Sequence, residues 1–200
     1  MRKRIILATL ALAGAMALSG CGGSKSASKN GKILTVEEGP DVETIDPALN
    51  QSADGANYIT MISDNLLRID KDGKIAPSMA EKYEVSDDGL TWTFHLRDGL
   101  KWSDGSDFTA NDFVYSWQRM VDPEVAAPYA ETMLGMVEGY KDAIGNPDAN
   151  GNTTTTPDRT KLKVEAPDDK TFVVHMSHPT PYFDRLASFA ALSPVKKEVV

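Results

Sequence analysis

The stretch LTWTFHLRDGLKWSDGSDFTANDFVYSWQRMVDP, residues 90–123, joins two hydrophobic periods within one tryptophan-rich block. In its first part, Trp92, Phe94 and Leu96 alternate with polar residues. Alternation with a period of two places these three side chains on the same face of a strand. We therefore expect a strand that is buried on one face and wet or half covered on the other.

The second part of the block predicts a turn and a capped helix. The Asp-Gly step at 104–105 is typical of a tight turn, and Thr109 with Asp112 three residues later is a shortened form of the capping box. Asp122-Pro123 would end the helix, because the residue before a proline avoids the helical conformation. The apolar face, which we expect to pack on the preceding sheet, consists of Phe113, Val114, Trp117, Met120 and Val121.

The rest of the chain predicts short strands, hairpin turns and further helices. Alternation, β-branched runs and turn residues indicate strands at residues 33–36, 67–70, 74–76, 83–85, 162–165 and 171–176. Helical spacing indicates helices at 55–66, 128–136 and 182–192, and the final residues, 196–200, would also be helical. In the first of these helices Asp54 would be the cap, with Ile59, Ile62 and Leu66 on one face. Residues 145–159 have no periodicity and predict a polar surface loop.

Several motifs of the chain occur together in one known family. The strand, the Trp102-Ser103-Asp104-Gly105 turn and the helix after it form the longest match. The others are Glu43-Thr44-Ile45-Asp46-Pro47, Leu66-Leu67, Ala80-Glu81-Lys82-Tyr83, Pro128-Tyr129-Ala130, Thr180-Pro181-Tyr182-Phe183 and Ser193-Pro194-Val195. In these residues the chain resembles the large extracytoplasmic solute-binding proteins of peptide ABC importers, family 5, and within them the oligopeptide-binding proteins.

The resemblance implies an α/β fold of the periplasmic-binding-protein type, two-lobed, of class II and of the large peptide-binding kind. Members of the family are more than twice as long, so the chain is expected to be an N-terminal fragment, incomplete at the C-terminus. We expect residues 33–63 to belong to the first lobe and to include a ligand-edge strand. Residues 64–194 would form the second lobe, and residues 195–200 would start the return to the first.

The N-terminus has the pattern of a bacterial secretion signal. Basic residues at 2–4 precede an apolar stretch at 5–18 that is too short to span a bilayer. The sequence Leu18-Ser19-Gly20-Cys21 looks like a lipobox, in which the cysteine thiol takes a diacylglyceryl group. An ordinary signal peptide beside an inert, buried cysteine is the alternative.

A lipobox predicts where the protein works. Residues 1–20 would be the signal peptide, and residues 21–32 would be the lipidated Cys21 with a flexible linker rich in glycine, serine and lysine. The acyl chains would anchor the protein to the membrane without a spanning helix. We therefore expect an exported protein, lipid-anchored at the outer face of the cytoplasmic membrane, on the periplasmic side of the envelope.

Composition excludes several classes of partner. Cys21 is the only cysteine, so we expect no disulfide. The chain has 29 acidic and 21 basic residues and a net charge of −8, and an acidic surface is repelled by phosphate, so we expect no nucleic-acid partner. The sequence contains no P-loop and no dinucleotide fingerprint. We expect a monomer without a cofactor.

The candidate catalytic and metal sites favour structural interpretations. The carboxylate pairs Asp87-Asp88 and Asp168-Asp169 fall in predicted turns, where aspartate bonds the nearby backbone. The segment 146–151 opens like an EF-hand loop, but the twelfth position is Pro157 instead of a bidentate glutamate. His175 and His178 lack a further ligand at zinc spacing. We therefore expect no catalytic residue and no metal site. The protein is not expected to be an enzyme.

The family resemblance supplies the candidate ligand contacts. Peptide importers accept many sequences, so the binding energy should come from the ligand backbone, and adding an extended peptide to an exposed strand edge provides this. The resemblance places such an edge at Gln51, Ser52 and Ala53 and a cleft aromatic at Tyr129. Relatives have a cleft-facing polar ring where this chain has Phe189, so that contact departs from the family pattern. The acidic residue for the ligand's amino group would lie beyond residue 200.

The function that we expect is that of a lipid-anchored receptor of an ABC importer. It would capture extended oligopeptides and deliver them to the permease subunits. The same fold could instead bind another solute, such as a dipeptide, a metal chelate or a signalling peptide. A surface-attached hydrolase or an adhesion lipoprotein is the alternative from a different class.

Overall fold

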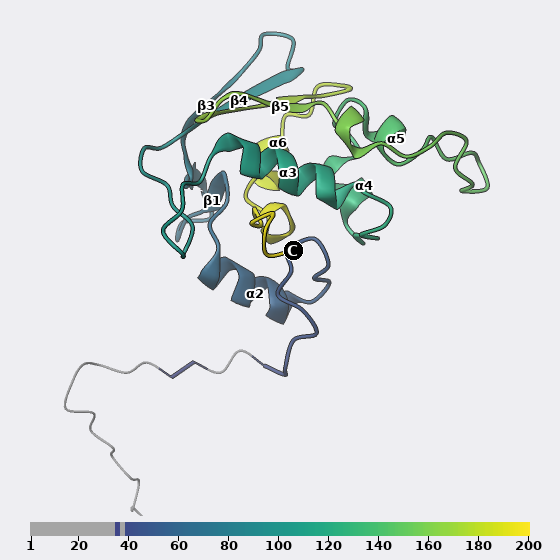
Figure 1. Ribbon diagram of the computed structural model, residues 1–200. Helices are drawn as coiled ribbons and strands as arrows, with labels where there is room; N and C mark the ends of the chain where they lie inside the picture. Colours follow the sequence, from purple (N-terminus) through teal and green to yellow (C-terminus); the bar gives the residue numbers. More distant parts are fainter. Residues whose placement is uncertain (1–34, 37–38) are drawn as a thin grey trace, which may run out of the picture. The chain divides into compact units, whose positions relative to one another are not determined.

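The structure is a computed structural model that describes residues 35–36 and 39–200 (Figure 1). The predicted signal peptide, Cys21 and the linker lie outside the described residues. The predicted strand at 33–36 is not present in its described part, because Thr35 and Val36 are irregular and exposed. Within the described ranges, no helix has the length and apolar character needed to cross a membrane.

A four-stranded antiparallel sheet is the centre of the fold. Its strands are β3 (Ala80–Val85), β4 (Thr91–Leu96), β5 (Val164–Asp168) and β6 (Thr171–His175), in the order β3-β4-β6-β5. The predicted hairpin and strand pair are confirmed, although β3 begins earlier than expected. As the alternation predicted, Trp92, Phe94 and Leu96 are all at most 4% exposed.

Helix α3 (Ala110–Met120) covers the buried face of this sheet (Figure 1). The predicted cap is confirmed, since the Thr109 N–H donates to Asp112 Oδ2 at 2.7 Å. Phe113 and Trp117, from the predicted apolar face, are at most 1% exposed. Burial of the Asp112 carboxyl raises its pKa, although Thr109 donates to it.

The predicted helix at 182–192 is wrong in its extent. The structure has the short helix α6 (Phe183–Leu186) and a 3-10 turn, η2 (Ala190–Leu192), with an extended Phe189 between them. After the break the Leu192 carbonyl accepts from Trp117 Nε1 at 3.2 Å. This hydrogen bond ties the segment to α3.

Helix α2 (Ala53–Ile62) begins before the predicted start, and its cap is Ser52 rather than Asp54. The Ser52 hydroxyl accepts from the Gly55 N–H at 2.9 Å. The predicted apolar face is also partly wrong, because Ile59 is buried but Ile62 is 65% exposed. The helix ends at Ile62, so the buried Leu66 lies outside it.

The remaining elements are short. A confirmed hairpin of β1 (Leu67–Ile69) and β2 (Ile75–Pro77) forms a second sheet. The helix predicted at 128–136 is shorter, α4 (Ala130–Leu134), and is followed by α5 (Tyr140–Ala143) and the 3-10 turn η1 (Arg159–Lys161). Between α5 and η1 the predicted polar loop extends away from the sheet (Figure 1). The final residues form a turn, not the expected helix.

Candidate functional site

The candidate segment at Gln51, Ser52 and Ala53 is only partly extended. Ser52 has extended dihedrals, φ −101° and ψ 149°, whereas Ala53 is the first residue of α2. No strand occurs at these residues, so the expected edge would be a short extended segment before a helix rather than a regular strand. All three side chains are exposed.

The backbone of this segment is unequally available for a ligand. Both groups of Ser52 are engaged, because its N–H donates to Asn50 Oδ1 at 3.3 Å and its carbonyl accepts from Asn50 Nδ2 at 2.9 Å. Within residues 39–200, no hydrogen bond engages the backbone N–H or carbonyl of Gln51 or the N–H of Ala53. Pairing with an extended ligand could therefore use Gln51 and the Ala53 N–H.

A cavity of about 280 Å³ lies beside Gln51. It is lined by residues 40–44, 49–52 and 54. The turn between the two lining stretches 40–44 and 49–52 is tied to α3 by the Asp46 carboxylate, which accepts from the Arg119 guanidinium at 3.1 and 2.7 Å. Both side chains are less than 20% exposed, so this bidentate pair fixes the segment before Gln51 on the sheet-covering helix.

The structure brings Tyr129 and Phe189 together. Their ring centroids are 6.4 Å apart with an interplanar angle of 67°, an edge-to-face arrangement. The Phe189 carbonyl also accepts from Asn65 Nδ2 at 2.7 Å. The Phe189 ring is 46% exposed, so the pair offers an apolar surface where relatives are expected to have a polar ring.

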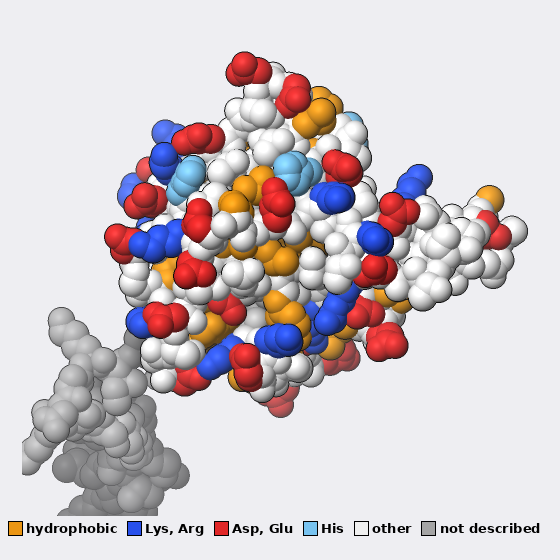
Figure 2. All heavy atoms as spheres, turned by 45° about the horizontal axis from the view of Figure 1, so that its top comes forward, with side chains coloured by type: hydrophobic (Ala, Val, Ile, Leu, Met, Phe, Trp, Pro, Cys, Tyr) orange, Lys and Arg blue, Asp and Glu red, His pale blue; other side chains and the backbone are white. Residues whose placement is uncertain are grey.

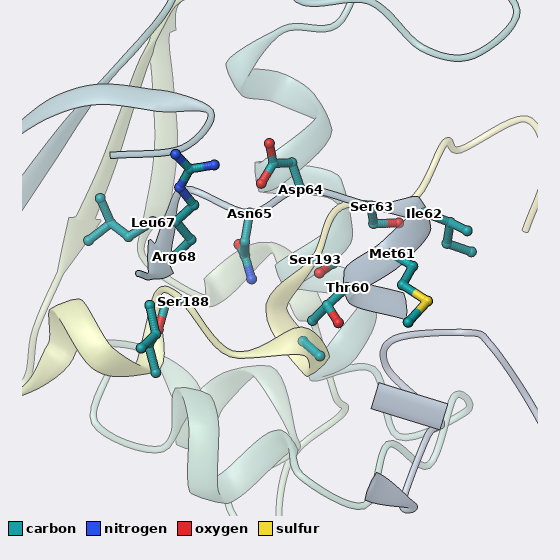
Figure 3. Close-up of a pocket in the computed structure, with 12 residues that line it drawn as sticks. Thr60, Met61, Ile62, Ser63, Asp64, Asn65, Leu67, Arg68, Ser188 and Ser193 are labelled. Carbon is teal, nitrogen blue, oxygen red and sulfur yellow. The ribbon is translucent and has the colours of Figure 1, made fainter. Parts of the chain in front are cut away.

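A larger cavity, of about 650 Å³, was not predicted from the sequence (Figure 3). It lies at the C-terminal end of α2, about 15 Å along the helix from Ser52. The lining combines exposed apolar side chains with polar ones, and it consists of residues 60–65, 67–69, 188, 190 and 193. These residues come from separate stretches of the sequence, so no periodic pattern predicted the cavity.

One backbone edge of this larger cavity is open. The Asp70 N–H donates to the Lys74 carbonyl, and antiparallel ladders alternate, so the backbone groups of Ile69 point away from β2. They point to the side where the Leu67 N–H donates to the Ala187 carbonyl at 3.3 Å. The cavity therefore presents one N–H and one carbonyl of a strand, with apolar side chains beside them.

The carboxylates that were considered for catalysis have turn-forming roles. Asp88 Oδ1 accepts from the Ser86 hydroxyl at 2.6 Å and the Leu90 N–H at 3.0 Å, and these bonds lower the Asp88 pKa. The Lys170 N–H donates to Asp168 at 2.8 Å and is the main cause of a lowered pKa there. A lowered pKa suits a structural carboxylate better than a general acid, whose pKa must be raised.

The predicted loop and the histidines also bond locally. Asp148 Oδ1 accepts from the Asn150 and Asn152 N–H groups at 2.8 and 2.9 Å. His175 Nε2 lies 3.1 Å from Glu165 Oε1, and His178 lies beside the Ser177 hydroxyl. In the part of the chain that the structure describes, no three His, Cys, Asp or Glu side chains converge as metal ligands.

Charged side chains of both signs occur together on the face of the molecule that Figure 2 shows. Figure 2 shows acidic and basic side chains interspersed on the face that includes the top of Figure 1, without a broad basic area on that face. Lys170 pairs with Asp98, and Lys82 with Glu84 at 3.0 Å. A face of this kind has no electrostatic attraction for a polyanion.

The family model described as bacterial extracellular solute-binding proteins, family 5 Middle, matches residues 74–199. The chain belongs to this family. The predicted resemblance and the α/β fold are confirmed by this match, which extends from the β1-β2 hairpin to the final turn. Family 5 is a family of solute-binding proteins located outside the cytoplasm, not a family of enzymes.

Individual relatives of this family 5 chain agree with the match. It is 38% identical over 197 residues to the periplasmic oligopeptide-binding protein OppA of Salmonella typhimurium, covering 98% of this chain and 34% of the relative. It is 36% identical to the probable deoxycholate-binding periplasmic protein YgiS of Escherichia coli, covering 80% of this chain and 28% of the relative. The chain therefore spans about a third of the length of the curated relatives that it matches.

A solved structure gives the same result for the fold. The crystal structure of Haemophilus influenzae OppA in complex with RPPGFSPFR matches with a TM-score of 0.73 at 38% identity. The match covers 82% of this chain and 30% of the solved chain. The family 5 chain thus has the fold of the corresponding part of a periplasmic binding protein.

Proposed function

We propose that the protein is the substrate-binding component of a peptide ABC importer, which captures extended oligopeptides and delivers them to a membrane permease. The observation that carries the proposal is the extended segment before α2, where the backbone groups of Gln51 have no protein partner within residues 39–200. Such groups can pair with the backbone of any peptide. The relative solved with the nonapeptide RPPGFSPFR supports a peptide as the ligand.

The proposed ligand contacts are Gln51, Ser52, Ala53, Tyr129 and Phe189. In this proposal the Gln51 backbone and the Ala53 N–H pair with the ligand backbone, and the exposed Phe189 ring contacts a ligand side chain. Residues 33–63 belong to a first lobe, residues 64–194 to a second, and residues 195–200 begin the return. The remaining contacts would come from a region that corresponds to the part of the relatives that this chain does not match.

The location follows from the N-terminal sequence. We propose cleavage after residue 20 and lipidation of Cys21, so that a monomeric receptor is anchored at the outer face of the cytoplasmic membrane. The basic residues at 2–4, the apolar stretch and the only cysteine in the chain support this proposal. Electrophoretic mobility and detergent partitioning of the C21S variant would test it, because loss of the lipid should release the protein from the membrane.

A second ligand class is supported by one comparison. The relative YgiS is named as a probable deoxycholate-binding protein, so the same fold is compatible with an amphipathic solute that is not a peptide. The exposed apolar side chains beside the larger cavity, Met61 and Ile62, would suit such a ligand. Peptide remains the leading proposal, because every residue of a peptide backbone carries one donor and one acceptor to pair with those of Gln51, whereas a bile acid has only its hydroxyls and one carboxylate.

The experiment is isothermal titration of the complete protein with peptides of two to about nine residues, and with deoxycholate in parallel. We expect binding of peptides and little heat with deoxycholate. Heat with deoxycholate alone would support the second ligand class, and no heat with any peptide would contradict the proposed function. Mass spectrometry of the recovered ligand distinguishes a binding protein, which returns an intact peptide, from a hydrolase.

A further inference from the structure

The Asn50 side chain is buried and uses its carboxamide on one neighbouring residue. Asn50 is 8% exposed, and its Nδ2 donates to the Ser52 carbonyl at 2.9 Å. Its Oδ1 accepts from the Ser52 N–H at 3.3 Å and from the Ser52 hydroxyl at 3.2 Å. Three hydrogen bonds from one side chain therefore hold Ser52 in its extended conformation.

The same bonds connect Asn50 to the start of α2. The Ser52 hydroxyl donates to Asn50 and at the same time accepts from the Gly55 N–H at 2.9 Å, which is the helix cap. The orientation of the cap hydroxyl is thus set by Asn50. We call this group, Asn50, Ser52 and Gly55, the Asn50 knot.

Gly55 leaves the space that the Asn50 carboxamide occupies. A Cβ atom on Gly55 would lie 1.9 Å from Asn50 Oδ1 and 2.8 Å from Asn50 Cγ, so the Asn50 side chain would have to leave its position. Glycine within a helix is normally unfavourable relative to alanine. Its presence near the start of α2 is explained by the close approach of Asn50, since Gly55 does not have a left-handed backbone conformation.

We propose that Asn50 is a positioning residue for peptide binding. This inference rests on the proposed function of the segment at Gln51. Asn50 engages the Ser52 N–H and, together with the Ala56 N–H at 3.1 Å, the Ser52 carbonyl, and so fixes the chain direction on either side of Gln51. The Gln51 backbone is then presented to the ligand in one conformation, so binding does not have to order it.

A purely structural role for the Asn50 knot makes a different prediction. If the knot only stabilises α2, then any change that restores stability should also restore peptide affinity. If Asn50 positions Gln51, affinity should depend on the carboxamide itself. The space between Asn50 and Gly55 allows the two roles to be separated, because an alanine at position 55 can fill the volume that is emptied when Asn50 is truncated.

The test uses four variants of the complete protein: Asn50→Ala, Gly55→Ala, the double variant N50A/G55A, and Asn57→Ala as the control. Asn57 is an exposed asparagine of the same helix whose side chain makes no hydrogen bond within residues 39–200. The probe is a peptide that the wild type binds. The measurements are Kd by titration calorimetry and Tm without ligand.

We expect N50A and G55A each to raise Kd roughly tenfold. Each variant loses one or two of the hydrogen bonds that order the Gln51 segment before the ligand binds. N57A should leave Kd unchanged. In N50A/G55A the clash with Asn50 is gone, and the Ser52 hydroxyl, which would lie 2.9 Å from the added Cβ and is no longer bonded to Asn50, has only to turn slightly aside. Tm should therefore rise above that of N50A while Kd stays weakened. This split between Tm and Kd is the result that a structural role would not produce.

Two failures are distinguishable. If the wild type binds peptide and N50A binds it equally well, or if the double variant recovers affinity together with Tm, Asn50 is not a positioning residue and the proposed function stands. If the wild type binds no peptide, the proposed function fails and the inference fails with it. An increase in Tm for G55A alone would also overturn the inference, because it would show that Asn50 does not occupy the space beside Gly55.

Discussion

The sheet with α3 and the segment at residues 39–65, which contains α2, are stabilised in different ways. In the first region Phe94, Phe113, Phe172 and Phe183 are 0% exposed and form one aromatic cluster with Trp117. In α2 only Gly55 and Ile59 are buried. The first region therefore owes its stability to a continuous apolar core, whereas the second depends on a few specific contacts.

Those contacts of the second region are polar as well as apolar. They are the buried Ile59, the ion pair of Asp46 with Arg119, and the hydrogen bond from Asn65 to the Phe189 carbonyl. Local stability follows the density of buried contacts, so α2 should open more readily than β4. The candidate ligand segment therefore lies in the less stable of the two regions. A few single side chains fix its position.

The largest expected effect comes from emptying the core of the sheet region. Trp117→Ala removes an indole that is 1% exposed. The ring centroid of Trp117 lies 4.9 Å from that of Phe172, and its Nε1 donates to the Leu192 carbonyl. We expect the free energy of unfolding to fall by about 3–5 kcal/mol. Urea denaturation followed by circular dichroism measures this.

Tyr182→Ala is the control for the core variant, because the Tyr182 side chain is 53% exposed. Its unfolding free energy should change by about 0.5 kcal/mol or less. A Trp117 variant that lost no more than the Tyr182 variant would show that the aromatic cluster is not the main source of stability, and the comparison would be wrong.

An intermediate effect is expected where the two regions are joined. Arg119→Ala leaves the Asp46 carboxylate, 18% exposed, without its guanidinium partner. We expect a local loss of about 1–3 kcal/mol, between the values for exposed and buried ion pairs. In hydrogen exchange, the amides of α2, which should already exchange faster than those of β4, should exchange faster still, while β4 is unchanged.

Arg159→Ala is the matched control for the junction. The Arg159 guanidinium pairs with Asp122 at 3.2 Å and lies beside the Tyr115 ring, so it stabilises the α3 side only. Its loss should leave the exchange of α2 unchanged. Faster exchange of α2 in both variants would indicate that the two regions open together, which contradicts their separation.

The smallest effect concerns the pH dependence of the sheet region. Burial raises the pKa of Asp112, so the folded protein holds a proton in a pH range where the unfolded chain has released it. The contribution of this group therefore falls as pH rises above the ordinary aspartate pKa of about 3.9. The difference in unfolding free energy between the wild type and Asp112→Asn should shift against the wild type over that range.

Urea midpoints of both proteins at several pH values between 4 and 6 measure this difference. Comparing the two proteins removes the opposite slope of carboxylates with lowered pKa values, such as Asp88 and Asp168, because both proteins contain them. A difference that is constant with pH would mean that the Asp112 carboxyl titrates alike in the folded and unfolded states.

Sequence periodicity predicted the parts of the fold that local physics controls. The alternation around Phe94 gave the buried strand face, and Thr109 with Asp112 gave the start of α3, because neighbouring residues decide both. The break after α6 was not predictable in this way. The segment after the break contacts α3 through a hydrogen bond between Trp117 and Leu192, which are 75 residues apart, and no local pattern shows such a contact.

The candidate ligand segment shows the same limit. Ser52 and Asp54 are both good helix caps, and the sequence alone did not show that Asn50 orients Ser52 for this role. Nor could it show that Tyr129 and Phe189 form a ring pair, since 60 residues separate them. Family resemblance selected the candidate residues, and only the structure described which of their backbone groups are engaged.

The loop at residues 145–159 has a consequence for how such a protein can diverge. Asp148 bonds the amides of Asn150 and Asn152, and an isolated pair of Pro147 with Thr153 closes the tip, so the loop is organised by its own residues. Adding residues at the exposed tip would cost only the small entropy of closing a longer loop. Descendants of this protein can therefore lengthen or shorten the loop, and acquire a new surface there, while the sheet keeps its sequence.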